Sequence, residues 1–198
     1  MAPTNIQSVF LDSSEIAVTP GSPISFDLKY KVSDGEQTTG LANLNIYYNS
    51  DLLTPKATTA DRKTINGFTP LRDTGGGIID NPLGVTPAIV SDTTNIDGDA
   101  NTDKYISLSY VSTSTKFPVT TTFASGKATA AEPTTLGKIT FETSNNSALW
   151  DAAETLKINV NGEPATGYGF GGFSIQIDTI LVFHQQVELL HRYLNPML

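Results

Sequence analysis

The sequence contains no cysteine in its 198 residues, which excludes a disulfide framework, a thiol nucleophile and a cysteine-ligated zinc site. Charged residues are also scarce, at 16% of the chain. Acidic residues outnumber basic ones by 20 to 12, which gives a net charge of −8. Nucleic acids and anionic membrane surfaces bind basic faces, so this charge balance argues against both as partners.

A long apolar run is missing too. No stretch approaches the roughly 20 apolar residues of a transmembrane helix, so we expect no membrane insertion. Residues 1–5 lack the charged and apolar regions of a signal peptide. Threonine, serine, asparagine and aspartate are abundant, a composition typical of extracellular β proteins, whose strand surfaces favour threonine. We therefore expect an extracellular or cell-surface location, although no signal peptide is visible in the chain.

Apolar and polar residues alternate along many segments, which is the pattern of half-buried strands. The clearest run covers residues 24–32 and follows a strong turn signal at Pro20-Gly21-Ser22-Pro23. Almost no segment shows helical periodicity. The sequence therefore predicts an all-β, antiparallel β-sandwich of jelly-roll type with about nine strands. The strand candidates are residues 4–11, 15–19, 24–32, 41–49, 105–111, 136–143, 156–160 and 173–177.

One domain is expected over residues 4–179, a length that suffices for a single core. Residues 54–104 are too long for a hairpin connection, so they are interpreted as a loop insertion with short strands at 67–71 and 87–90. The tail at 180–198 carries an apolar helical stripe, which predicts a C-terminal helix. Three interpretations of this tail stay open: a docking helix, an interaction tail, or sequence foreign to the domain.

Two smaller segments also carry expectations. Residues 145–154 are expected to hold one helical turn, with the single tryptophan, Trp150, packing at the core edge. The glycine-rich residues 167–173 are expected to form a β-bulge or a flexible corner.

An acidic, amide-rich segment at residues 92–103 offers side-chain oxygens at alternate positions. Calcium takes about six to eight oxygen ligands, and Gly98 permits the tight bend that a loop around an ion needs. An EF-hand register fails, because it places Thr93 and Lys104 at the two anchor positions. We predict a Ca²⁺ loop of another type, and the competing interpretation is a solvated turn. The predicted metal ligands are Asn95, Asp97, Asp99, Asn101 and Asp103.

No catalytic constellation is visible in the sequence. The glutamates are scattered, with no motif that would pair two carboxylates for glycoside hydrolysis. A Gly-x-Ser-x-Gly elbow is absent, and His184 and His191 both lie in the tail, seven positions apart. We therefore expect no enzymatic activity and name no catalytic residue.

Four segments, in this order and spacing, resemble the cohesin family over about residues 6–178. Residues 18–26 are similar to the family's opening turn and second strand, and residues 44–53, Leu-Asn-Ile-Tyr-Tyr-Asn-Ser-Asp-Leu-Leu, to its third strand and corner. Residues 105–110 are similar to a central strand, and residues 136–142 to a late strand. Carbohydrate-binding modules share this kind of sandwich.

The resemblance implies a non-catalytic binding or scaffolding module of a secreted or cell-surface bacterial protein, with a dockerin-like protein partner. The alternative is a carbohydrate-binding module that binds polysaccharide with the help of calcium. Cohesins bind dockerins through one exposed sheet face, which the insertion at 54–104 could cover in this chain. The implied partner-binding residues are Asn43, Asn45, Tyr47, Asn49, Tyr105, Ser107 and Ser109. The implied core residues are Leu44, Ile46, Tyr48, Ile106, Leu108 and Tyr110.

Overall fold

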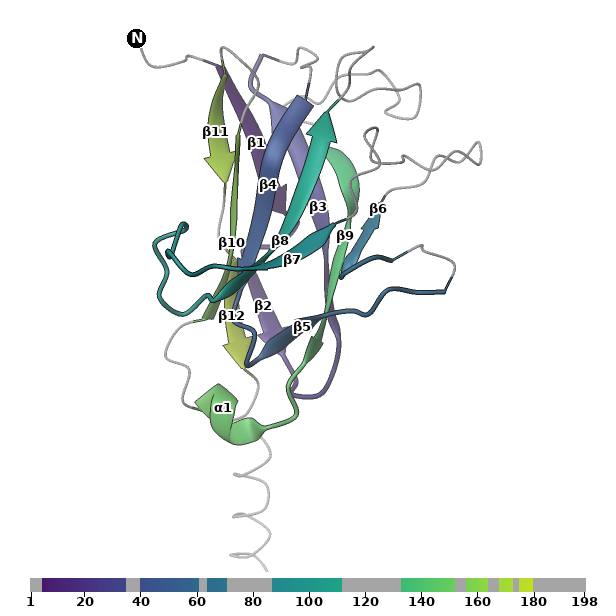
Figure 1. The fold of residues 1–198 in the computed structure, drawn as a ribbon, viewed down its shortest axis with the longest axis vertical. Helices are drawn as coiled ribbons and strands as arrows, with labels where there is room; N and C mark the ends of the chain where they lie inside the picture. Colours follow the sequence, from purple (N-terminus) through teal and green to yellow (C-terminus); the bar gives the residue numbers. More distant parts are fainter. Residues whose placement is uncertain are drawn as a thin grey trace, which may run out of the picture.

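A computed structural model describes residues 5–34, 40–60, 64–70, 87–111, 133–151, 156–163, 168–172 and 175–179. These residues form twelve strands and one short helix (Figure 1). The elements are β1 (Asn5–Leu11), β2 (Glu15–Val18), β3 (Ile24–Val32), β4 (Gly40–Tyr48), β5 (Leu53–Pro55), β6 (Phe68–Pro70), β7 (Ala88–Ser91), β8 (Lys104–Val111), β9 (Thr134–Thr143), α1 (Ser147–Asp151), β10 (Leu156–Glu163), β11 (Tyr168–Gly172) and β12 (Ile175–Thr179). No helix among these residues has the length and apolar character that crossing a membrane requires.

The strands form two six-stranded sheets, which confirms the predicted all-β sandwich. The first sheet has the order β11-β1-β3-β9-β5, with β6 also paired to β9. The second sheet, called here the loop sheet, has the order β2-β12-β10-β4-β8-β7. Most neighbouring strands are antiparallel, but β1 pairs with β11 and β2 with β12 in parallel. The predicted antiparallel sandwich therefore also contains two parallel pairs, each at one edge of a sheet.

Alternation along β3 shows how the sequence specifies this arrangement. Its apolar residues are buried, whereas the polar residues between them are more exposed. A turn with Gly21 at φ = +80° precedes the strand and is tied to the end of β9 by a hydrogen bond from the Gly21 N–H to the Ser144 carbonyl. Glycine tolerates such a φ because it has no Cβ. This turn thus carries the chain from β2, in the loop sheet, to β3, in the first sheet.

The core lies between the two sheets and takes side chains from both. Tyr48 of β4 packs against Phe141 of β9, with ring centroids 5.0 Å apart. Burying a phenylalanine side chain contributes about 1.5–3 kcal/mol to folding. Trp150 of α1 closes the edge of the core at 2% exposure and donates from its Nε1 to the Ser144 carbonyl at 2.8 Å. The expected helical turn and the packing role of Trp150 are therefore confirmed.

The predicted core positions on β4 and β8 are confirmed where their side chains are described: Leu44, Ile46, Tyr48, Ile106 and Leu108 are all buried. The side chain of Tyr110 lies outside the described part of the chain. The two short strands expected in the insertion are present as β6 and β7. The tail at 180–198, with its predicted helix, falls outside the described residues.

The glycine-rich segment at 168–172 is a strand that pairs with β1 in continuous register, not the β-bulge or flexible corner that the sequence predicted. Its glycines allow close approach to neighbouring strands. A Cβ on Gly172 would lie 2.0 Å from the carbonyl oxygen of Val160, and one on Gly171 would lie 2.9 Å from the Ser8 hydroxyl. The missing side chain at Gly171 therefore lets β11 approach β1, and the one at Gly172 lets it approach β10.

Asp27 on β3 accepts hydrogen bonds from the ammonium groups of Lys29, at 3.2 Å, and Lys138, at 3.3 Å. Burial alone would raise the pKa of this carboxyl, but the hydrogen bonds and charges of the two lysines outweigh it and hold the pKa below its ordinary value. A lowered pKa stabilises the fold above the unfolded-state pKa, and this contribution is lost as the pH falls through the folded-state value.

We predict that Asp27→Asn lowers the free energy of unfolding at neutral pH by about 0.5–1 kcal/mol, because the carboxyl is partly exposed and the ion pairs are screened. The difference from the parent should disappear in acid. Urea denaturation at several pH values measures both effects. Asp51→Asn, at an exposed position, serves as the control. An equally large and pH-dependent loss of unfolding free energy in this control would show that the ion pairs of Asp27 are not its cause.

Candidate functional site

The outer face of the loop sheet brings together polar and aromatic side chains from three strands. In the sheet register, Asn45 of β4 lies opposite Ser107 of β8 and Asn161 of β10. Tyr47 lies opposite Tyr105 on one side and Asn159 on the other. Alternation places these residues on the face opposite the buried core residues. Asn45 and Tyr47 of β4 therefore share a face with Tyr105 and Ser107 of β8, and a role of this face in partner binding stays a prediction.

Tyr47 is the exception to the expected solvent exposure of this face. Its side chain is completely buried, although it is not part of the hydrophobic core cluster. The ring packs against Tyr105, with centroids 5.0 Å apart, and the hydroxyl accepts a hydrogen bond from Asn45 Nδ2 at 3.2 Å. Burial, with smaller contributions from the charges of Asp92 and Asp97, raises the pKa of the phenol. A segment on the outer side of the sheet therefore covers the Tyr47 side chain.

The covering element is the segment at residues 92–103, called here the acidic loop, which connects β7 to β8. Its two ends are closed by a hydrogen bond from the Asp92 N–H to the Asp103 carbonyl at 2.8 Å. The N–H of Asp103 in turn donates to the Tyr48 carbonyl at 3.2 Å. Because β7 pairs with β8, the loop starts at the edge of the loop sheet and turns back over its outer face.

Turns within the acidic loop use the residue types that sequence reasoning singled out. Asn95 has a left-handed φ of 52°, and Gly98, whose N–H donates to the Asn95 carbonyl at 3.2 Å, has a φ of 76°. The Asp92 carboxylate accepts from the N–H of Ile96. Asparagine and glycine tolerate these backbone angles, and aspartate side chains accept local N–H bonds in such turns. The loop is thus held in shape by its own polar groups.

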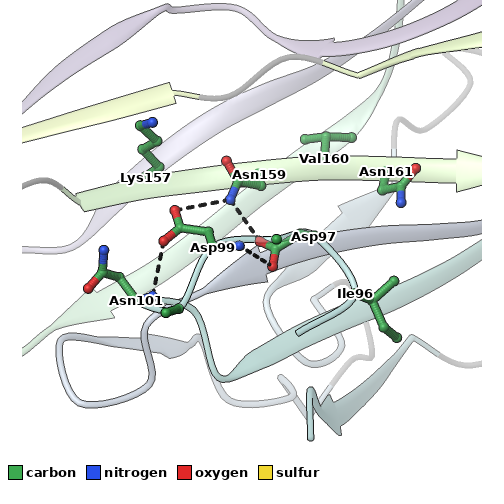
Figure 2. Close-up of a pocket in the computed structure, with 10 residues that line it drawn as sticks. Ile96, Asp97, Asp99, Asn101, Lys157, Asn159, Val160 and Asn161 are labelled. Atoms are coloured by element: carbon green, nitrogen blue, oxygen red, sulfur yellow. Dashed lines mark hydrogen bonds between the residues drawn. The ribbon is translucent and has the colours of Figure 1, made fainter. Parts of the chain in front are cut away.

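Asn159 of β10 attaches the acidic loop to the sheet (Figure 2). Its Nδ2 donates to Asp97 Oδ2 at 2.7 Å and to Asp99 Oδ2 at 3.3 Å. Thr102 also donates from its hydroxyl to Asp97 Oδ2, at 2.9 Å. Hydrogen bonds to charged groups contribute more than neutral ones, about 1.5–3 kcal/mol each. The amide of Asn159 thereby gathers two carboxylates over the strand position beside Tyr47.

A polar pocket of about 480 Å³ lies between the acidic loop and β10. The loop contributes residues 96–101, and β10 contributes residues 157 and 159–161. Asp97, Asp99 and Asn159 therefore occupy a recess, not a flat surface (Figure 2). Carboxylate and amide oxygens can coordinate a cation or accept hydrogen bonds from hydroxyl and N–H groups.

The five predicted metal ligands do not converge on one point. Asp97 and Asp99 lie together, but Asp103 is turned away, accepting from the N–H and hydroxyl of Ser50 at 2.7 and 2.6 Å. Asn101 uses its carbonyl to accept from Asn49 Nδ2 at 2.9 Å. Among the described residues, no three acidic or histidine side chains are arranged to hold a metal ion. Asp97 and Asp99, the acidic pair, are therefore the two predicted ligands that lie together, and Ca²⁺ binding by the acidic loop stays a prediction.

The partner-binding positions fall into different environments. Asn43 is exposed, with a φ of 47°, where the pairing of β4 with β8 shifts register. Asn45, Asn49, Tyr105 and Ser107 are half-buried, and the side chain of Ser109 is outside the described part of the chain. Tyr47 was expected to be an exposed binding residue, but its side chain is completely buried. The acidic loop lies over the middle of the predicted face, and the margins of that face stay partly or fully exposed.

Sequence reasoning did not select Asn159, Asn161, Lys157 or Thr102. The first three occupy alternate positions of β10, which the sequence predicted only as far as residue 160, so the shared outward face of Lys157 and Asn159 could have been inferred. What the alternation does not reveal is that β10 pairs with β4, which is distant in sequence. Without that pairing, nothing connects Asn159 with the acidic loop.

No known protein family model matches the chain, and no curated protein matches it. Comparison with solved structures finds cohesin modules, the family that the sequence resembles. The sixth cohesin of scaffoldin B from Acetivibrio cellulolyticus, solved with a dockerin, is 13% identical with a TM-score of 0.42, over 87% of this chain and 99% of that one. The seventh ScaB type I cohesin of Pseudobacteroides cellulosolvens is 11% identical with a TM-score of 0.41, over 90% and 96%. A type I cohesin–dockerin complex from Clostridium thermocellum gives 10% identity and a TM-score of 0.41, over 89% and 94%.

We predict that Asn159→Ala lowers the free energy of unfolding by about 1–3 kcal/mol, because two carboxylates lose their shared donor. Urea denaturation measures this loss. Lys157→Ala, which truncates another pocket-lining side chain of β10, is the matched control and should have a smaller effect. Equal losses in the two variants would show that Asn159 does not hold the loop.

Calcium binding stays a prediction, now centred on the acidic pair. If Ca²⁺ binds the native state alone, a hundredfold excess over its dissociation constant stabilises the fold by about 2.7 kcal/mol. Thermal unfolding with added calcium and with chelator measures this shift, and Asp97→Ala with Asp99→Ala should abolish it. Asp103→Asn, altered at the carboxylate that is bonded to Ser50, should retain it. Coincident melting curves of the parent with and without calcium would contradict the prediction.

Proposed function

We propose that this chain is a non-catalytic, protein-binding module of a secreted or cell-surface bacterial protein, with a dockerin-like partner. The family resemblance of the sequence supports the class of partner. The observation that carries the proposal is the acidic loop on the outer face of the loop sheet, where that resemblance locates the partner. In this chain the surface offered to a partner is the acidic loop together with the exposed margins of β4 and β8.

This surface has the composition that protein partners use. Ile96, at the turn of the acidic loop, is 54% exposed and lines the pocket beside Asp97 and Asp99. An exposed apolar side chain surrounded by polar groups is a common arrangement at protein interfaces. The two carboxylates and the net charge of −8 favour a partner with a basic patch at the contact.

A non-catalytic role agrees with the chemistry of the described residues. The pocket holds two aspartates, a lysine and three asparagines, but no serine or histidine. Its two carboxylates share one amide donor and lie close together, whereas the two carboxylates of a glycosidase are held apart on opposite sides of the scissile bond. The pocket therefore suits recognition better than bond cleavage.

Polysaccharide binding is the second candidate, because the pocket offers carboxylate and amide groups that can bond to sugar hydroxyls. Sugar-binding sites also use exposed aromatic faces for stacking. Tyr47 is buried and Tyr105 packs against it, so neither ring is fully open on this face. This observation favours the protein partner over the sugar.

Binding of purified dockerin modules to the full chain, followed by surface plasmon resonance, tests the proposal. We predict that Ile96→Asp lowers the affinity by about tenfold or more, because truncating a central interface anchor costs more than about 1 kcal/mol. Ile6→Asp, an exposed apolar position on β1 in the other sheet, is the control and should bind as the parent does.

Two outcomes would contradict the proposal. Equal losses in the Ile96 and Ile6 variants would place the binding surface elsewhere or indicate general unfolding, which circular dichroism would detect. Retention of the chain on insoluble polysaccharide, with no dockerin bound, would favour the second candidate.

A further inference from the structure

The sequence contains two Asn-Gly pairs, Asn66-Gly67 and Asn161-Gly162. In such a pair the backbone nitrogen of the glycine can attack the Cγ of the asparagine side chain, because glycine has no Cβ to obstruct the approach. In an unfolded chain the two pairs are chemically alike. The fold gives them different surroundings, and those surroundings decide which asparagine can react.

Asn161 lies exposed near the end of β10 and lines the pocket below the acidic loop. The N–H of Gly162 donates to Asn161 Oδ1 at 2.8 Å, so the attacking nitrogen already lies against the side-chain amide. The pairing of β10 with β4 shifts register between Asn161 and Glu163, so the regular ladder is interrupted at this point.

In the Asn66-Gly67 pair, the side-chain amide and the glycine N–H both make hydrogen bonds to other residues. Its Nδ2 donates to the Pro87 carbonyl at 2.6 Å, and the N–H of Gly67 donates to the Lys56 carbonyl at 2.9 Å. A Cβ at Gly67 would meet Pro55 at 2.9 Å, so the turn is also packed against its neighbour. For this pair to react, both hydrogen bonds must break first.

We propose that Asn161 is a site of spontaneous amide loss in the folded protein. The Gly162 nitrogen forms a bond to Asn161 Cγ, the Cγ–Nδ2 bond breaks, and the proton of the attacking nitrogen leaves with the amide as ammonia. The resulting succinimide then adds one water molecule and opens at either carbonyl. The product at position 161 is aspartate or isoaspartate, with no oxidant or reductant involved.

The product would change the pocket, whether or not the proposed partner binds there. Either product adds a negative charge to a pocket that already holds Asp97 and Asp99. Isoaspartate also lengthens the backbone of β10 by one methylene, next to its pairing with Asn45. The glycine that enables the reaction is required by packing, because a Cβ at Gly162 would lie 2.9 Å from the Phe170 ring.

Peptide mapping by mass spectrometry tests this proposal on the full chain. Native and urea-unfolded samples are incubated at mildly alkaline pH in isotopically labelled water, so that each hydrolysed succinimide carries a solvent oxygen. We expect Asn161 to convert several-fold faster than Asn66 in the native protein. In the unfolded chain the two should convert at similar rates.

Conversion of Asn161 in the native protein at a rate no greater than that of Asn66 would overturn the proposal. So would a native Asn161 that stays intact over the time in which the unfolded chain converts. Asn161→Gln, with a longer side chain, should abolish the product at this position and leave the rate at Asn66 unchanged. The Gly162 position is not suited to a control, because a side chain there meets Phe170.

Discussion

The two hydrogen bonds from the Asn159 amide to Asp97 and Asp99 determine what this sandwich presents to solvent. Two carboxylates repel each other, and a shared donor on a rigid strand offsets that repulsion. The acidic loop consequently lies across the outer face, Tyr47 is enclosed below it, and a polar pocket forms between the loop and β10.

Most of the fold could be predicted from the sequence because the alternation of apolar residues is a local signal. Residues 24–32 show it along their whole length, and β3 occupies that range. Trp150 and its helical turn were also predictable from local pattern. The parallel pairs of β1 with β11 and β2 with β12 were not, because strand pairing depends on contacts between segments distant in the chain.

The candidate site was predictable in its parts and not in its assembly. The oxygen-rich composition of residues 92–103 pointed to a binding loop, and the shared face of Asn45 and Tyr47 followed from alternation. The sequence could not show that Asp103 turns to Ser50, or that Asn159 bonds to Asp97. Those contacts join segments separated by 53 and 62 positions, and no periodic pattern encodes them.

Amide hydrogen exchange across residues 92–103 tests most directly that the loop is docked on the sheet. The account predicts that the N–H groups of Asp92 and Asp103, which bond to the Asp103 and Tyr48 carbonyls, exchange slowly in the native chain. It also predicts that Asn159→Ala accelerates exchange throughout the loop. Rapid exchange of these amides in the parent protein, as in an unstructured connection, would contradict the account.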